Sequence, residues 1–224
     1  EHTEMAKGEV VLLDFWASPF AMRVKIALAE KGVECEAREE DLFGSKSPLL
    51  LQSNPVYKKV PVLLHGDKPV CESLVILGYV DEAWPAPPLL PPCPYDRASA
   101  RFWAQFADSK LFEAGGKIWK SKGEAQQAAK EEFIGAVKLL EGALGEKDYF
   151  GGDSFGYLDV VVAPLTSWFH AYEQCGGFKV EEECPTFAAW MKRCMARESV
   201  AGALPDAEQV YELVRTMKKM HGIE

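Results

Sequence analysis

The chain has 224 residues, 48% of them hydrophobic and 11% aromatic, which is sufficient for one large domain or two smaller ones. Its formal net charge of −9, from 34 acidic and 25 basic residues, disfavours nucleic acid as a partner because both would be negatively charged. No apolar run approaches the roughly 18 uncharged residues of a membrane-spanning helix, and the N-terminal stretch EHTEMAKGEV lacks the apolar segment of a signal peptide. We therefore expect no membrane partner and no secretory leader.

Neither the cysteines nor the histidines are spaced like metal ligands. The six cysteines form no C-x-x-C pair, and the four histidines do not cluster. A structural zinc site, a disulfide framework and metal catalysis are therefore not expected. This cysteine usage favours a reducing compartment, such as the cytoplasm.

The first third of the chain alternates strand and helix signals. VVLLDF (10–15) is a nearly continuous apolar run typical of a buried strand, and SPFAMRVKIALAEKG (18–32) has helical spacing with Gly32 as its stop. The remaining signals are, in order, a strand over 33–38, a short helix within 45–55, a strand over 60–66, a turn at GDKP, a short PVC strand, and a helix from Glu72 to about Ala83. The predicted order is β-α-β-α-β-β-α.

A proline-rich break separates this region from the rest of the chain. WPAPPLLPPCP (84–94) has six prolines in eleven residues, which excludes regular helix or sheet and indicates a stiff linker. Beyond it, helical spacing predicts helices over 95–120, 123–145, 156–175, 185–197 and 206–220. We therefore predict an α/β domain over 8–83, a linker over 84–94 and an all-helical domain over 95–224.

Ser18 stands where the first strand pattern gives way to the first helix. A Ser-Pro pair is typical of a helix start, since serine caps free N–H groups and proline suits the first helical position. A Ser-His-Asp triad is not credible, because there is no G-x-S-x-G motif and no suitably placed histidine. Ser18 is thus either a cap or a hydroxyl that donates a hydrogen bond to an anion at the helix N-terminus.

Two further stretches allow both a structural and a binding interpretation. Pro61 heads a strand; base rates favour a trans bond, whereas a cis bond would turn the backbone of Val60 outward to pair with a peptide-like ligand. Glu72 and Ser73 begin a helix as caps, or they form a corner in which Ser73 and free N–H groups hold a carboxylate and Glu72 holds an ammonium. From the local sequence alone, the trans bond and the cap are favoured.

Taken together, these residues resemble the cytosolic glutathione transferases, most closely the plant tau class. The similarity runs through nearly the whole chain, and the order and spacing of several stretches carry it. These are VLLDFWASPFAMRVKIALAEKG, KSPLLLQSNPVYKKVPVLLHG, KPVCES, PYDRASARFWAQFADSK, YFGGDSFGYLDV and ECPTFAAWMKRC. The resemblance implies a thioredoxin-like domain that binds glutathione, followed by a helical bundle.

The resemblance assigns roles to the candidate residues of the glutathione site. Ser18 matches the catalytic serine, and Pro61 matches the cis-proline that leaves the Val60 backbone to pair with the cysteinyl unit. It further implies Glu72 and Ser73 at the γ-glutamyl end, Lys46 and Lys59 near the glycyl carboxylate, and Arg23 and Asp108 in a polar network around the γ-glutamyl site.

The same resemblance implies a site for a hydrophobic electrophile between the two domains. Its expected lining is Phe20, Phe112, Gly116, Trp119 and Trp168, with Met217 and Met220 closing it, although each aromatic residue is equally consistent with core packing. Gly116 departs from the pattern, because some tau-class members carry a bulky basic residue there. We therefore expect a roomier pocket.

The stretch GDSFGYLDV (152–160) resembles the helix-capping element of the family's second domain. Asp159 would accept backbone N–H bonds near the start of a helix. Gly156 stands where many relatives have serine or threonine, so only half of the capping box is present. We assign this element to folding.

The implied function is conjugation of glutathione to hydrophobic electrophiles, with glutathione peroxidase activity as a further option. Glutathione would be a co-substrate, no cofactor is expected, and the family implies a homodimer. In the alternative, the same pocket carries hydrophobic ligands without catalysis. A thiol oxidoreductase is disfavoured, because that activity expects cysteine where Ser18 stands.

Overall fold

The computed structural model describes residues 9–223, so the predicted domain start at Gly8 and the features predicted for residues 1–8 lie outside it. The described residues form two compact units that divide between Leu90 and Pro91. Residues 84–93 contain neither helix nor strand, and a helix begins at Pro94. None of the helices described between residues 9 and 223 combines the length and the apolar character needed to cross a membrane.

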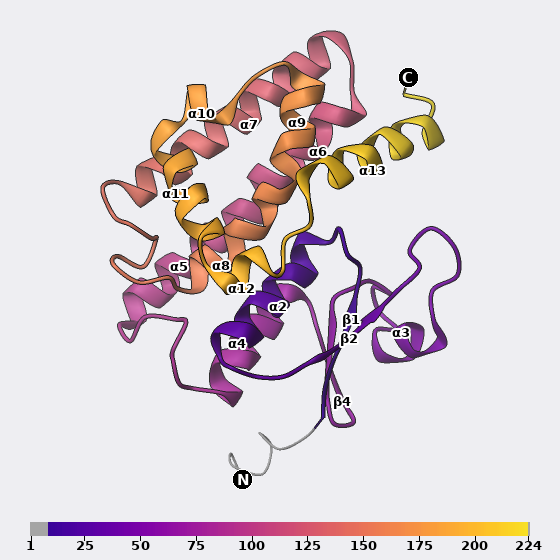
Figure 1. Cartoon of the computed structure of the whole chain (residues 1–224), viewed down its shortest axis with the longest axis vertical. Coiled ribbons are helices and arrows are strands. Elements are labelled where there is room, and N and C mark those ends of the chain that lie inside the picture. Colours follow the sequence, from indigo (N-terminus) through magenta and orange to yellow (C-terminus); the bar gives the residue numbers. More distant parts are fainter. Residues whose placement is uncertain (1–8, 224) are drawn as a thin grey trace. The chain divides into compact units, whose positions relative to one another are not determined.

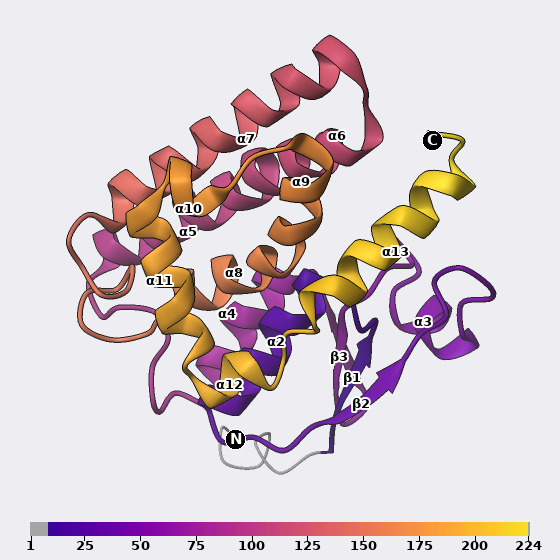
Figure 2. The same cartoon turned by 45° about the horizontal axis from the view of Figure 1, so that its top comes forward.

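The first unit has the predicted βαβαββα order of a thioredoxin-like domain (Figure 1 and Figure 2). Its elements are β1 (Val10–Asp14), α2 (Pro19–Glu30), β2 (Glu36–Glu39), α3 (Pro48–Ser53), β3 (Val62–His65), β4 (Lys68–Cys71) and α4 (Ser73–Ala83). The sheet order is β2-β1-β3-β4, with β1 parallel to β2 and antiparallel to β3, and with β3 antiparallel to β4.

Helices cover both faces of this sheet: α2 and α4 lie together on one face and α3 on the other (Figure 2). Leu13 and Val62 pack with Leu50 of α3 in one buried cluster. Leu12 and Leu63, which pair across β1 and β3, point to the opposite face because side chains alternate along a strand. Burial on both faces explains the nearly continuous apolar run of β1.

The first two helices begin with the same Ser-Pro signal. The Ser18 and Ser47 hydroxyl oxygens accept hydrogen bonds from Ala21 N (3.3 Å) and Leu50 N (3.0 Å), and proline follows each serine. Helix α2 ends as predicted, with Gly32 at a φ of 65°, where glycine adopts the left-handed conformation without strain.

A buried ion pair, which the sequence pattern did not indicate, fixes the segment that follows α4. The Lys31 Nζ atom lies 2.6 Å from Asp81 Oδ1 and 2.5 Å from the carbonyl oxygen of Pro87. Asp81 also accepts from the backbone N–H groups of Leu89 (2.7 Å) and Leu90 (3.1 Å). The Lys31 side chain is fully buried, so removing either member of the ion pair would leave the other charge buried and unneutralised.

The second unit is helical, as predicted. Its elements are α5 (Pro94–Phe106), the π-helix η1 (Ala107–Phe112), α6 (Glu113–Lys120), α7 (Gly123–Leu144), α8 (Tyr157–Val162), the 3₁₀-helix η2 (Ala163–Trp168), α9 (Phe169–Gly176), α10 (Val180–Glu183), α11 (Pro185–Met195), α12 (Glu198–Ala201) and α13 (Ala207–Met220). The prediction of regular helices over 95–120 and 156–175 was wrong in detail. A π-helical turn interrupts the first, and a 3₁₀ turn containing Pro164, which lacks a backbone donor, interrupts the second.

Asp159 is the buried centre of the capping element. Its carboxylate accepts hydrogen bonds from Phe150 N (3.0 Å), Gly156 N (3.0 Å) and Trp190 Nε1 (2.8 Å). Burial raises the pKa of this carboxyl group, and the three donors partly offset that effect. Because Gly156 has no side chain, only the aspartate half of the capping box exists, as predicted.

Helices α6 and α9 lie side by side (Figure 1), and Gly115 of α6 faces Tyr172 of α9. A Cβ atom at Gly115 would lie 2.3 Å from Cε2 of the buried Tyr172 ring, whereas one at the adjacent Gly116 would meet only Lys120 Nζ, at 3.8 Å. Glycine at 115 therefore sets the distance between these helices.

We predict that Gly115→Ala lowers the free energy of unfolding by about 1–3 kcal/mol, because the added methyl group overlaps the Tyr172 ring. The matched control, Gly116→Ala, adds the same methyl group where space is open, and should be neutral or stabilising by up to about 1 kcal/mol. Urea unfolding followed by circular dichroism measures both. Equal effects of the two substitutions would contradict the close-approach explanation.

We also predict that Lys31→Met destabilises the protein by about 3–5 kcal/mol, because it leaves the buried Asp81 carboxylate without its cation. Lys117→Met is the control, since it breaks an exposed Lys117–Glu132 pair and should cost less than about 1 kcal/mol. Urea unfolding again provides the measurement, and a similar small effect for both variants would refute the anchoring role.

Candidate functional site

The strand register brings the ends of three elements of the first unit together. Leu13 near the end of β1 pairs with Val62 at the start of β3, and Val62 pairs with Cys71 at the end of β4. The candidate residues Ser18, Pro61 and Glu72 lie just beyond these three ends. Residues predicted from separate stretches of the chain therefore meet at one end of the sheet.

Ser18 caps the N-terminus of α2 and is buried. Its backbone N–H donates to the carbonyl of Phe15 (2.8 Å), which fixes the turn between β1 and α2. Its hydroxyl oxygen accepts from Ala21 N, so the hydroxyl proton is not used by that bond. The cap interpretation is confirmed, and the geometry is compatible with a hydroxyl that also donates to an anion at the helix N-terminus.

The peptide bond between Val60 and Pro61 is cis, as the family resemblance implies and against the base-rate expectation. Val60 is half-buried, and the loop before it is held by Asn54, a residue that the sequence analysis did not single out. Asn54 is buried and donates through Nδ2 to the Lys59 carbonyl (3.0 Å), while its Oδ1 accepts from Tyr57 N (3.1 Å). The Asn-Pro pair that closes α3 was the available signal for this role.

Glu72 and Ser73 occupy different environments, and the interpretation of both as side-chain caps was wrong. Glu72 stands at the N-cap position of α4 with an exposed side chain that makes no cap bond. Its φ of 70° is uncommon for a residue other than glycine. Ser73 is buried, and its Oγ accepts a hydrogen bond from Arg23 Nη1 (3.0 Å).

Arg23 joins the N-terminal part of α2 to the start of α4. Its side chain is fully buried, bonds Ser73, and lies over the half-buried Phe20 ring with 5.0 Å from Cζ to the ring centroid. The structure thus brings together Arg23, which the resemblance places with Asp108 in a polar network, and Ser73, which the resemblance places at the γ-glutamyl end. Asp108, the other predicted member, lies in η1 of the second unit, and its role stays a prediction.

The two candidate lysines are exposed on neighbouring segments. Lys46 donates through Nζ to the carbonyl of Lys58 (2.8 Å), which ties the loop before α3 to the loop before Pro61. Lys59 follows directly. Both amines are accessible to an anionic group, and their contact with a carboxylate stays a prediction.

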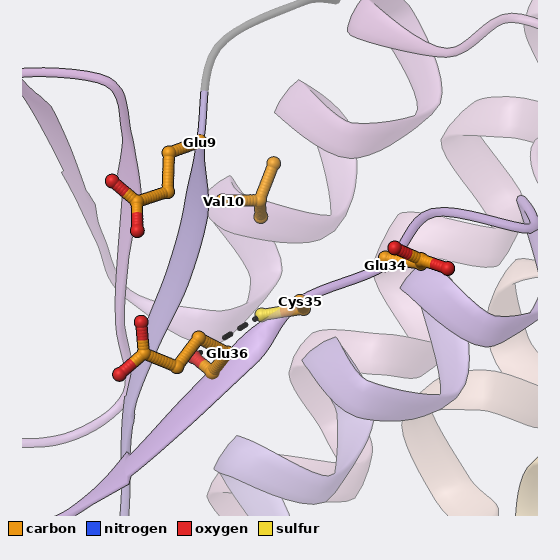
Figure 3. A pocket seen from close by; sticks show the side chains of 5 residues that line it. All are labelled: Glu9, Val10, Glu34, Cys35 and Glu36. Carbon is orange, nitrogen blue, oxygen red and sulfur yellow. Dashed lines mark hydrogen bonds between the residues drawn. The ribbon is translucent and has the colours of Figure 1, made fainter.

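A shallow pocket of the first unit is not part of this constellation. It is lined by Glu9, Val10, Glu34, Cys35 and Glu36 (Figure 3), near the start of β1, whereas Ser18 follows the end of that strand. Burial raises the pKa of the Cys35 thiol to about 11, so the thiolate is disfavoured there. Three glutamates would also repel a carboxylate ligand.

The predicted hydrophobic-site residues of the second unit fall into two groups. Phe112, the last residue of η1, lies edge-to-face with Trp168 of η2, with ring centroids 6.4 Å apart. Trp119 of α6 is buried and lies edge-on to His221, which follows α13 (6.4 Å). Gly116 precedes Trp119 by one turn; Met217 is half-buried and Met220 is largely exposed.

Comparison with known proteins accounts for this arrangement. Residues 8–82 match the family model described as the glutathione S-transferase N-terminal domain, and residues 123–193 match the model of the C-terminal domain. A probable glutathione S-transferase, parC, of Nicotiana tabacum is 55% identical over 98% of this chain and 100% of its own length. The chain belongs to the glutathione S-transferase family.

Further similarities place this family member in the tau class. Glutathione S-transferase U28 of Arabidopsis thaliana is 55% identical over 97% of this chain and 98% of its own. The crystal structure of rice GST1 (OsGSTU1) in complex with glutathione matches with a TM-score of 0.92 and 52% identity, covering 96% of this chain and 98% of that one. The tau-class transferase of mango, Mangifera indica, matches with a TM-score of 0.88 and 42% identity, covering 93% and 98%.

We predict that Arg23 and Ser73 act as an energetically coupled pair. Ser73→Ala removes the acceptor of a hydrogen bond from a buried cation and should lower the free energy of unfolding by about 1.5–3 kcal/mol. After Arg23→Lys has removed the Nη1 donor, the same substitution should cost at least about 1 kcal/mol less.

Urea unfolding of the two single variants and the double variant measures this coupling, with Ser45→Ala as a control at an exposed serine outside any helix. Strictly additive effects of Arg23→Lys and Ser73→Ala would show that the bond contributes nothing.

Proposed function

We propose that this protein transfers glutathione to hydrophobic electrophiles, using Ser18 to stabilise the glutathione thiolate. The observation that carries the proposal is the meeting of Ser18, the cis Val60–Pro61 bond and the Glu72–Ser73 corner at one end of the sheet, in a chain of the glutathione S-transferase family. The names of its relatives and the glutathione complex of the rice structure support an enzyme rather than a non-catalytic carrier.

Glutathione would bind by its polar groups along this end of the sheet. The backbone of Val60 pairs with the cysteinyl unit, Glu72 binds the ammonium of the γ-glutamyl end, and Ser73 with the N-terminal amides of α4 binds its carboxylate. Lys46 and Lys59 attract the glycyl carboxylate. These contacts place the cysteinyl sulfur beside the N-terminus of α2, where Ser18 lies.

Ser18 would act on the ionisation of the bound thiol. A free thiol with a pKa of about 8.5 is only ~3% thiolate at pH 7, and the thiolate is the nucleophile. A hydrogen bond from the Ser18 hydroxyl and the positive end of α2 both favour the anion. A pKa lowered by about two units makes roughly three quarters of the thiol ionised at pH 7, which corresponds to about 2.7 kcal/mol.

The chemical step then needs no covalent intermediate with the enzyme. The thiol proton goes to water, and the thiolate electron pair forms a new carbon–sulfur bond with the electrophile. With an aryl chloride, the carbon–chlorine bond breaks and chloride leaves with its bonding pair. The enzyme contributes by holding both substrates adjacent and by keeping the sulfur ionised.

The proposal also covers the second substrate, the physiological role, the compartment and the oligomeric state. The second substrate is a hydrophobic electrophile bound by Phe20, Phe112, Trp119 and Trp168, with detoxification as the physiological role and peroxide reduction as an additional activity. We propose that the protein acts in the cytoplasm as a homodimer and needs no cofactor besides glutathione as co-substrate. Light scattering tests the dimer, and a monomer at micromolar concentration would exclude it.

We predict that Ser18→Ala lowers kcat at pH 7 by about 20-fold and leaves the KM for glutathione nearly unchanged, since the substitution reduces the thiolate fraction rather than the binding contacts. The loss should shrink as the pH rises above about 8.5, where a free thiol ionises without help. Steady-state turnover of 1-chloro-2,4-dinitrobenzene between pH 6 and 9.5 measures both effects.

Ser47→Ala is the matched control, because Ser47 also caps a helix of the same unit from a Ser-Pro pair. Both variants lose a cap worth about 1 kcal/mol of stability, and Ser47→Ala also loses the hydrogen bond from its hydroxyl to Glu40, but only Ser18→Ala should lose turnover. Equal turnover losses would mean that Ser18 acts as a cap alone, and full activity of Ser18→Ala would refute the thiolate role.

A further inference from the structure

The absence of a side chain at Gly116 does not leave that position without a charged group. Lys120, one helical turn later on α6, places its Nζ 3.8 Å from where a Cβ of residue 116 would lie. The same Nζ lies 5.0 Å from the centroid of the Trp119 ring, within the range of a cation–π interaction. An ammonium group therefore lies beside Gly116, the position from which a roomier pocket is expected.

No acid within the described part of the chain forms an ion pair with Lys120. Lys117 on the same helix, by contrast, is paired with Glu132 at 3.0 Å. The packed ends of α6 and α13 add further cations, because Lys218 and Lys219 occupy the last turn of α13. In a chain with a net charge of −9, this is a local concentration of positive charge.

These observations point to one class of ligand. Resting on the proposed function, we propose that Lys120 is a specificity-determining residue that favours aromatic electrophiles carrying a negatively charged group, such as a carboxylate. The aromatic ring of such a substrate would pack in the electrophile site proposed above, to which we assign Trp119. Its anionic group lies beside the Lys120 ammonium, which donates up to three hydrogen bonds.

Helix electrostatics alone do not explain this geometry. Lysines are favoured in the last turn of a helix because they complement its negative end, and this accounts for the presence of Lys117 and Lys120 there. It does not account for the position of the Lys120 ammonium over Gly116 and Trp119. A methyl group at position 116 would lie in ordinary van der Waals contact with the Lys120 ammonium, 3.8 Å away, and would not displace it.

The test compares two electrophiles that differ in charge: 4-chloro-3,5-dinitrobenzoate and the neutral 1-chloro-2,6-dinitro-4-(trifluoromethyl)benzene. Lys120→Met keeps the aliphatic cover over Trp119 and removes the charge. It should lower kcat/KM for the benzoate by about fivefold at low ionic strength and leave the neutral substrate within about twofold. Lys120→Glu should lower kcat/KM for the benzoate further than Lys120→Met does. Added salt should reduce the preference of the wild type for the benzoate over the neutral substrate.

Lys117→Met is the matched control, since it removes a paired lysine from the same helix and should leave the ratio of the two kcat/KM values unchanged. Equal losses for both substrates in Lys120→Met, or no loss for either, would overturn the proposal. Failure of the wild-type protein to turn over either electrophile, and 1-chloro-2,4-dinitrobenzene as well, would refute the proposed function itself, so the two failures are distinguishable.

Discussion

The antiparallel pairing of β3 with both β1 and β4 is the constraint on which the candidate site depends. Through Val62, this pairing aligns the end of β1, the start of β3 and the end of β4. Ser18, Pro61 and Glu72 follow or precede these ends by a few residues. Because a register shift of a single residue would exchange the two faces of a strand, the packing of Leu13 and Val62 against α3 also fixes the site.

The candidate site includes the N-termini of two helices, and buried polar contacts join these helices at both ends. Helix α2 presents Ser18 at its start, and α4 begins at Ser73; Arg23 connects the two through one buried hydrogen bond. At the other end of these helices, Lys31 at the end of α2 and Asp81 of α4 form the ion pair that also holds residues 87–90. A site that must stabilise an anion benefits from such rigid dipoles, since they need no reorganisation when the charge develops.

Two serines with the same Ser-Pro sequence differ in the hydrogen bonds that their hydroxyl groups make. Ser18 and Ser47 are both followed by proline and both cap a helix. Ser47 also donates to Glu40 at 2.6 Å, so its hydroxyl proton is already bound to an acceptor. The proton of Ser18 has no such use in its cap bond, and Ser18 lies beside the cis-proline loop and the start of α4. The same motif thus leaves the hydroxyl proton bound to an acceptor at Ser47, whereas the cap bond of Ser18 leaves its hydroxyl proton for the role that we propose.

The sequence by itself determined the order of the elements, because apolar periodicity and Ser-Pro and glycine signals are local properties of the chain. The family and most of the candidate residues came from the resemblance of several stretches to the glutathione transferases. The sequence did not indicate the burial of Arg23, the Lys31–Asp81 pair, the support of the Pro61 loop by Asn54, or the π-helical turn that carries Asp108 and Phe112. Gly116 shows the difference most directly. Its lack of a side chain is evident in the sequence, but only the tertiary structure places the Lys120 ammonium above it, because a long side chain is directed by packing around Trp119 and not by its position in the chain.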